Sequence, residues 1–83
     1  MGINRENITE HLIEYQLKMI NQSLEIIEKD PEWYSNFSMT KDQHEEFKKY
    51  AISLIKKVFK CNKSKAVNTF NWFDFEFGLR IEN

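Results

Sequence analysis

The apolar residues between positions 47 and 58 constrain the fold more than any other feature of this sequence. Four of them recur at spacings of four, three and four residues, namely Phe47, Ala51, Leu54 and Val58. That spacing places them in one stripe along an α-helix. Thr40 and Gln43 form a capping-box pair before the stripe, and the lysines at its end suit the carbonyl end of a helix dipole. The pattern predicts an amphipathic helix over residues 41–60.

A second helical pattern covers residues 8–29. Asn7 and Glu10 form a capping-box pair at its start, and Pro31 stops it, because a proline inside a helix clashes with the preceding turn. Pro31 also suits the first position of a short helical turn near residues 31–35. The apolar residues of the long helix cover an arc of about 200°, which is wider than one neighbouring helix requires. We therefore expect this helix to contact two elements of the chain, or a second copy in a homodimer.

A third helix is predicted over residues 64–77. Its apolar residues share one face, namely Ala66, Phe70, Phe73 and Phe77. Ser64 is the expected N-cap. Gly78 is expected to adopt the left-handed conformation of a Schellman motif, with Leu79 folding back onto the helix end.

The end of the chain also fits a β-strand. From Phe73 to Glu82, apolar residues alternate with other residues, which is typical of a half-buried strand. No other segment alternates in this way, so a strand over residues 73–82 would find a partner only in a second copy of the chain. We prefer the helix that ends at a glycine.

These patterns predict an all-α fold, a small bundle of three main helices, in a single domain over residues 1–83. The apolar share of 41% and the charged share of 30% are typical of a globular domain. No repeat or linker divides the chain. A domain of this size has one core with a modest net stability.

The sequence also indicates a cellular compartment. Cys61 is the only cysteine, so it cannot form an internal disulfide, and we expect a reducing environment. The first residues do not form a signal peptide, and no apolar stretch approaches the roughly 20 residues of a membrane span. The excess of Ile, Asn, Lys and Phe indicates an AT-rich genome. We expect a protein of the cytoplasm of a bacterial host cell, without a membrane partner.

No catalytic or metal-binding constellation appears in the sequence. His11 and His44 belong to no metal-binding motif and are expected at the outer surface of their helices. Cys61 has no histidine beside it and is expected to be a partly buried, small apolar residue at a helix end. Two glycines do not suffice for a phosphate-binding loop. We therefore expect no enzymatic activity, no cofactor and no metal.

The charges are distributed asymmetrically along the chain. Seven lysines and no acidic residue lie between Phe47 and Phe73, whereas the rest of the chain carries five basic and thirteen acidic residues. Five of these lysines are expected to form a ridge: Lys49, Lys56, Lys60, Lys63 and Lys65. Such a ridge attracts phosphate groups or an acidic protein, so nucleic-acid binding is one hypothesis. The other is a solvated helix face with lysines favoured by the helix dipole.

The aromatic residues near the end of the chain suggest a contact surface. On a helix over residues 64–77, Trp72 and Phe75 point away from the apolar stripe, and exposed large aromatics anchor many protein interfaces. The alternative is that the helix over residues 8–29 or the segment 33–37 covers both rings. The expected protein-binding surface consists of Trp72, Phe75, Lys49, Lys56 and Lys60.

The residues from Glu32 onward resemble a known group of proteins. The resemblance lies in Glu32-Trp33-Tyr34, Met39-Thr40, Gln43, Phe47, Ala51, Leu54-Ile55-Lys56-Lys57, Trp72-Phe73 and Phe77-Gly78-Leu79-Arg80. This stretch is similar to short, uncharacterised proteins of phages and prophages that have a Trp-Phe and Gly-Leu ending. The resemblance implies no activity and no functional residue. It implies an accessory protein, of a class that often acts by occluding a host protein.

Together these features predict a small, non-enzymatic binding protein. We expect an accessory protein of a phage or mobile element that binds a host or phage protein stoichiometrically and so can inhibit it. Two alternatives stay open, a nucleic-acid-binding protein that uses the lysines of residues 48–65 and a structural homodimer.

Overall fold

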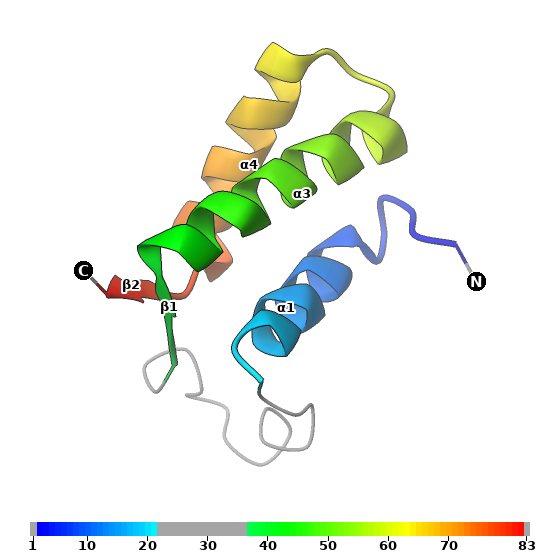
Figure 1. Ribbon diagram of the computed structural model, residues 1–83. Coiled ribbons are helices and arrows are strands. Elements are labelled where there is room, and N and C mark those ends of the chain that lie inside the picture. The colour runs from blue at the N-terminus through cyan, green and yellow to red at the C-terminus, as the bar shows by residue number, and fades with distance from the viewer. Residues whose placement is uncertain (1, 22–36, 83) are drawn as a thin grey trace.

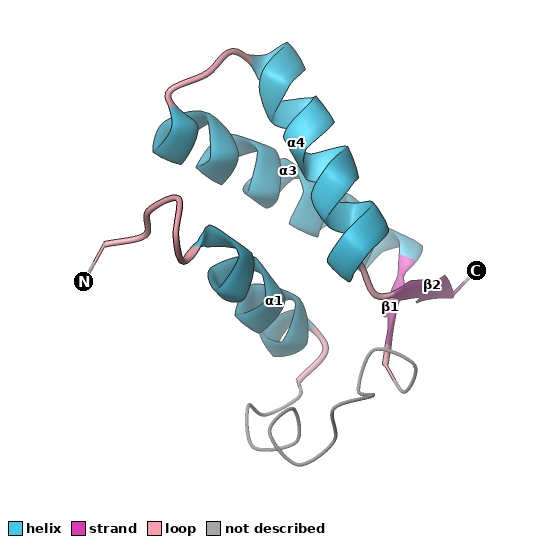
Figure 2. Ribbon diagram, turned by 180° about the vertical axis from the view of Figure 1, so that it is seen from behind, coloured by secondary structure: helices cyan, strands magenta, loops and turns pink. Residues whose placement is uncertain are grey.

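Three helices and two very short strands make up the part of the chain that the computed structural model describes, residues 2–21 and 37–82 (Figure 1). The elements are α1 (Ile8–Met19), β1 (Ser38–Thr40), α3 (Lys41–Phe59), α4 (Lys63–Phe77) and β2 (Arg80–Glu82). α3 packs against both α1 and α4, and the strands lie together where α3 begins and α4 ends (Figure 2). The predicted fold class, a small bundle of three main helices, is confirmed.

α3 follows its prediction closely. Its capping box is complete, because the Gln43 N–H donates to Thr40 Oγ1 at 3.1 Å and the Thr40 N–H donates to Gln43 Oε1 at 2.9 Å. At the other end, Lys60 adopts a left-handed conformation with a φ of 51°, and its N–H donates to the carbonyl of Lys56. The helix therefore begins at the predicted residue and ends one residue before the predicted end.

α1 is shorter than the helix predicted over residues 8–29. It begins where predicted but ends at Met19, and Asn21 has a φ of 60°. A left-handed residue cannot continue the helix, and asparagine adopts this conformation more readily than most residues. Asn21 therefore ends α1 although the apolar periodicity continues beyond it. Residues 22–29 and the predicted turn near residues 31–35 lie outside the described residues.

The start of α1 lacks the predicted capping box of Asn7 and Glu10. Asn7 Oδ1 instead accepts the N–H of Asn4 at 2.7 Å, and Asn4 Oδ1 accepts the N–H of Glu6 at 2.9 Å. These hydrogen bonds form a side-chain-mediated turn before the helix. The prediction was wrong because a backbone N–H upstream of Asn7 competes for the oxygen that would have capped the helix.

Both ends of α4 differ in detail from the prediction. Asn62 caps the helix instead of Ser64, and its Oδ1 accepts the Lys65 N–H at 2.9 Å. Gly78 has a φ of −69°, so the predicted Schellman motif, which needs a left-handed residue, does not form. Glycine is required there because a Cβ would overlap the carbonyl oxygen of Asp74, which accepts the Gly78 N–H at 3.0 Å.

The two strands form a parallel pair. In register order the partners are Ser38 with Arg80, Met39 with Ile81 and Thr40 with Glu82. The alternative prediction of a strand over residues 73–82 is wrong for residues 73–77, which are helical, and correct only for residues 80–82. β2 pairs with β1 of the same chain and not with a second copy. Alternation could not identify β1 as the partner because it spans only three residues.

The core lies between the helices and centres on Phe47 of α3. This ring is fully buried, and its centroid lies 6.1 Å from that of Tyr15 of α1. On the other side it lies 5.8 Å from Phe70 and 6.1 Å from Phe73, both on α4. The other buried apolar side chains are Ile8, Leu12, Leu17, Met39, Ala51, Ile55, Ala66, Phe70, Phe73 and Leu79. Three helices, Met39 of β1 and Leu79 just before β2 therefore share one core.

Replacing Phe47 with alanine should lower the free energy of unfolding by about 3–5 kcal/mol, because a fully buried ring is lost and a cavity remains. Phe75→Ala removes the same ring from a position that is 86% exposed, and should change this energy by no more than about 0.5 kcal/mol. Urea unfolding followed by circular dichroism measures both variants. Equal losses would contradict the central position of Phe47.

Gly78→Ala should lower the free energy of unfolding by about 1–3 kcal/mol, because the new methyl group forces the chain away from the Asp74 carbonyl. Gly2→Ala is the matched control, since nothing lies within 4 Å of a Cβ at that position. Thermal unfolding of both variants provides the comparison. A Gly78→Ala variant as stable as the control would show that the end of α4 can shift without loss.

Candidate binding groove between α3 and α4

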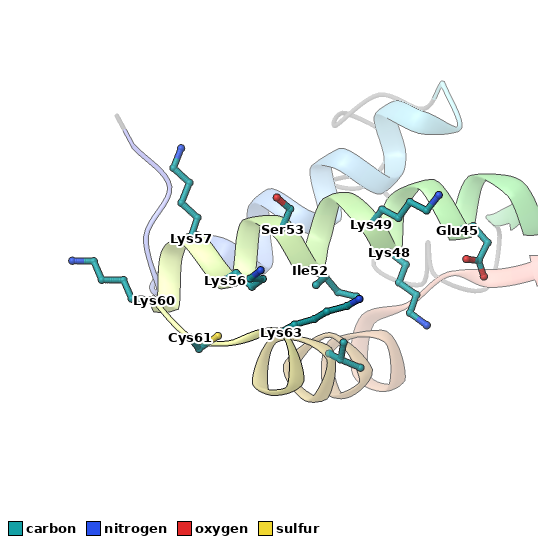
Figure 3. A pocket seen from close by; sticks show the side chains of 11 residues that line it. Glu45, Lys48, Lys49, Ile52, Ser53, Lys56, Lys57, Lys60, Cys61 and Lys63 are labelled. Carbon is teal, nitrogen blue, oxygen red and sulfur yellow. The ribbon is translucent and has the colours of Figure 1, made fainter.

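A groove of about 840 Å³ runs between α3 and α4 (Figure 3). The lining residues are Glu45, Lys48, Lys49, Ile52, Ser53, Lys56, Lys57, Lys60, Cys61, Lys63 and Val67. The groove thus gathers six of the seven lysines that the sequence places between Phe47 and Phe73. The seventh, Lys65, is exposed and does not line it. We call this hollow the lysine groove.

Helical spacing positions the lysines. Lys49, Lys56 and Lys60 are separated by seven and four residues, so they share one face of the α3 segment, away from the buried stripe. All three side chains are exposed. Lys63 comes from the first turn of α4 and extends between the two helices in Figure 3. Two helices therefore contribute cations to one groove.

The lysine groove also has an apolar floor. Ile52 of α3 and Val67 of α4 are half-buried, and both line the groove together with Cys61 of the connecting turn. Cys61 is half-buried, as predicted. Such a floor can bury an apolar side chain of a ligand, while the lysines around it attract negative charge.

The charge of the lysine groove is not neutralised by ion pairs within the described residues. None of its lysines has an ion-pair partner there, and Glu45 is the one acidic residue of the lining, at one end of the groove in Figure 3. No acidic side chain in the first turn of α4 offsets the positive end of its helix dipole. This dipole therefore adds to the positive electrostatic potential of the groove. The groove therefore attracts anionic partners, most strongly at low salt.

Trp72 and Phe75 are both exposed on α4, by 54% and 86%. The Trp72 ring meets the ring of Phe77 edge-on, with 5.8 Å between the centroids. Neither Trp72 nor Phe75 lines the lysine groove, and Trp72 lines a smaller hollow where α1, α3 and α4 meet. The structure therefore brings Lys49, Lys56 and Lys60 together but leaves the two aromatic residues outside their groove.

Both histidines are half-buried and hydrogen-bonded, although the sequence predicts them at the outer surface. His11 Nε2 lies 2.5 Å from the hydroxyl of Tyr50, and His44 Nε2 lies 3.2 Å from Asp74 Oδ1. These partners are 39 and 30 positions away in sequence, so no local signal could identify them. Among the described residues, no three His, Cys, Asp or Glu side chains gather in a way that could hold a metal ion.

Tyr50 belongs to a small aromatic cluster between α1 and α3. Its ring stacks on that of Tyr15, with 3.9 Å between the centroids and 5° between the planes. Burial raises the pKa of Tyr50 above its ordinary value of 10.0, and the neighbouring Tyr15 raises it further. The cluster favours a neutral Tyr50 hydroxyl beside His11 and does not line the lysine groove.

We expect the contribution of Tyr50 to stability to be complete below pH 10 and to decrease as the pH rises above it. The unfolded chain releases the Tyr50 proton near pH 10.0, whereas the folded chain retains it to higher pH, so alkaline pH favours unfolding. Urea unfolding between about pH 8 and 11 should show a smaller decline for Tyr50→Phe than for the wild type. Identical declines would contradict the raised pKa.

No helix within residues 2–21 and 37–82 combines the length and the apolar character that crossing a membrane requires. A comparison with known protein families, curated proteins and solved structures finds no match to this chain.

Proposed function

We propose that this chain is a non-enzymatic binding protein that holds an acidic, amphipathic segment of another protein in the lysine groove. The observation that carries the proposal is one hollow that combines an apolar floor with lysines that have no ion-pair partner among the described residues. A helix that presents leucine-like residues on one side and carboxylates beside them matches both features. Laying such a helix into a groove is a common mode of peptide recognition.

The floor of the groove favours a protein over a nucleic acid. Ile52 and Val67 offer apolar surface that phosphate groups cannot use. Single-stranded nucleic acids are usually held on aromatic side chains that stack on the bases. The lining of the groove contains no aromatic residue. Glu45 would also repel a continuous phosphate backbone at one end.

The exposed aromatic pair supports a second protein-binding surface. Phe75 is 86% exposed and Trp72 is 54% exposed, in a chain that has few other large apolar residues on the described surface. Large exposed rings are frequent hot spots of protein interfaces. This surface would act beside the lysine groove and independently of it.

The biological role that fits these surfaces is that of an accessory protein of a phage or mobile element in the cytoplasm of a bacterial host. The resemblance of the segment from Glu32 onward to short phage proteins supports this role. Nucleic-acid binding through Lys49, Lys56, Lys60, Lys63 and Lys65 and a homodimer through the helix that begins at Ile8 are the alternatives.

A labelled synthetic peptide tests the lysine groove. The peptide is a helix of about four turns with leucines on one face and glutamates beside them on both flanks of that face, and a scrambled peptide of the same composition is its control. Fluorescence anisotropy should show that the amphipathic peptide binds and that the scrambled one binds at least about tenfold more weakly. Equal affinities would show that the apolar floor is not used.

Matched charge reversals locate the site. The double variant Lys56→Glu and Lys60→Glu should bind the amphipathic peptide about tenfold or more weakly, because two electrostatic attractions become repulsions. Lys18→Glu with Lys41→Glu changes the net charge equally at exposed positions outside the groove, and should alter the affinity by less than about threefold. A loss of affinity on Phe75→Ala would instead move the site to the aromatic surface.

Oligonucleotide binding tests the alternative that the lysines hold a nucleic acid. Single-stranded and double-stranded oligonucleotides of similar length should bind more weakly than the amphipathic peptide. If they bind more tightly, and if log K falls with log salt at a slope of about −0.9 for each phosphate contacted, the nucleic-acid alternative replaces the proposal. Lys65→Ala should then weaken binding as well, whereas it should not affect a peptide held in the groove.

A further inference from the structure

A second hollow, of about 210 Å³, lies where α1, α3 and α4 meet. We call it the Trp72 hollow. Its inner wall consists of core residues that are at most 6% exposed: Ile8, Leu12, Ile55 and Phe73. Trp72 forms an exposed part of its outer wall. The exposed part of the Trp72 side chain leaves apolar surface in water beside this wall, and an apolar ligand gains free energy by covering it.

A cation stands beside this apolar hollow. Arg5 lines it, is exposed, and has its guanidinium carbon 5.1 Å above the ring of Phe59, which lines it too. Within the described residues Arg5 has no carboxylate partner. The stacking on Phe59 holds the guanidinium near the hollow without neutralising it. Its planar fork is suited to a carboxylate, which it can bind through two parallel hydrogen bonds.

A hydroxyl group adds a further polar contact. Thr9 lines the Trp72 hollow and is half-buried, and its side-chain hydroxyl makes no hydrogen bond within the described residues. Its hydroxyl can therefore donate to a ligand oxygen. An apolar pocket with a few convergent polar groups is the general form of a small-ligand site. The volume is below the roughly 300 Å³ at which such sites usually begin, which limits the ligand to one ring or a short chain.

We propose that the Trp72 hollow binds a small apolar carboxylate. The apolar body lies against Trp72, next to the core residues of the inner wall, and the carboxylate pairs with Arg5 at the mouth. Two sources share this chemistry, a free monocarboxylic acid and the C-terminal carboxylate of a peptide that ends in an apolar residue. The inference is independent of the function proposed for the lysine groove, because the two hollows share no lining residue.

The indole N–H resonance of Trp72 in nitrogen-15-labelled protein reports on the site. Its assignment comes from comparison with Trp72→Phe. Titration with 3-phenylpropionate should shift this resonance saturably, with a Kd on the order of 1 mM for so small a ligand. The neutral amide of the same acid and acetate, which lacks the apolar body, should each bind about tenfold more weakly or not at all.

Arg5→Gln is the decisive variant, since Arg5 is exposed and its replacement leaves the core intact. It should raise the Kd for 3-phenylpropionate about tenfold and leave the affinity for the amide unchanged. Lys18→Gln removes the same charge from an exposed position outside both hollows and should have no effect on either. A tripeptide that ends in phenylalanine, with a free or an amidated C-terminus, distinguishes the two sources. Tighter binding of the tripeptide with a free carboxylate than of 3-phenylpropionate indicates a peptide C-terminus, and the opposite order indicates a free monocarboxylic acid.

Three results would overturn the proposal. The first is a Trp72 resonance that does not shift in concentrations well above the millimolar range. The second is equal affinity for the acid and its amide, which would leave no role for the charge of Arg5. The third is an unchanged Kd in Arg5→Gln. Any of them would reduce the Trp72 hollow to a packing irregularity at the junction of three helices.

Discussion

The packing of Phe47 against two neighbouring helices is the contact on which the rest of this structure depends. The ring meets Tyr15 of α1 on one side and Phe70 and Phe73 of α4 on the other, and no part of it reaches solvent. The buried apolar residues of the described segments form one core cluster, and a domain of this size has only a modest net stability. The position of α4 relative to α3, and with it the groove between them, therefore depends on how this one ring is packed.

Local signals determined much of the fold. The apolar stripe of α3 and the capping box of Thr40 and Gln43 need only a few neighbouring residues, and both were predictable. The early end of α1 at Met19 was not, because the left-handed conformation of Asn21 outweighs the apolar periodicity that follows it. The pairing of β2 with β1 was also beyond local reasoning, since the partners lie 42 positions apart and each strand is too short to show alternation.

The candidate site likewise combines features that could be predicted from the sequence with features that could not. The lysines could be found from the sequence because they lie close together in the chain and recur at helical spacing. Helical spacing predicted that Trp72 and Phe75 point away from the apolar stripe, but it could not exclude that another element covers them; both are exposed. The apolar floor formed by Ile52 and Val67 could not be found, since it exists only when two helices face each other. The separation of Trp72 from the lysines likewise depends on which side of α4 meets α1 and which side borders the groove.

The two helices that form the lysine groove, α3 and α4, are connected to each other at both ends. At one end, residues 60–62 join α3 directly to α4, and at the other the hydrogen-bonded strands hold the start of α3 to the end of α4. Because the groove lies between these two connections, the backbone of its walls is ordered before any partner arrives. The loss of backbone freedom on association then falls mainly on the incoming segment. A complex would accordingly be tightened by stiffening the partner in its bound shape, and hardly at all by stiffening the backbone of this protein.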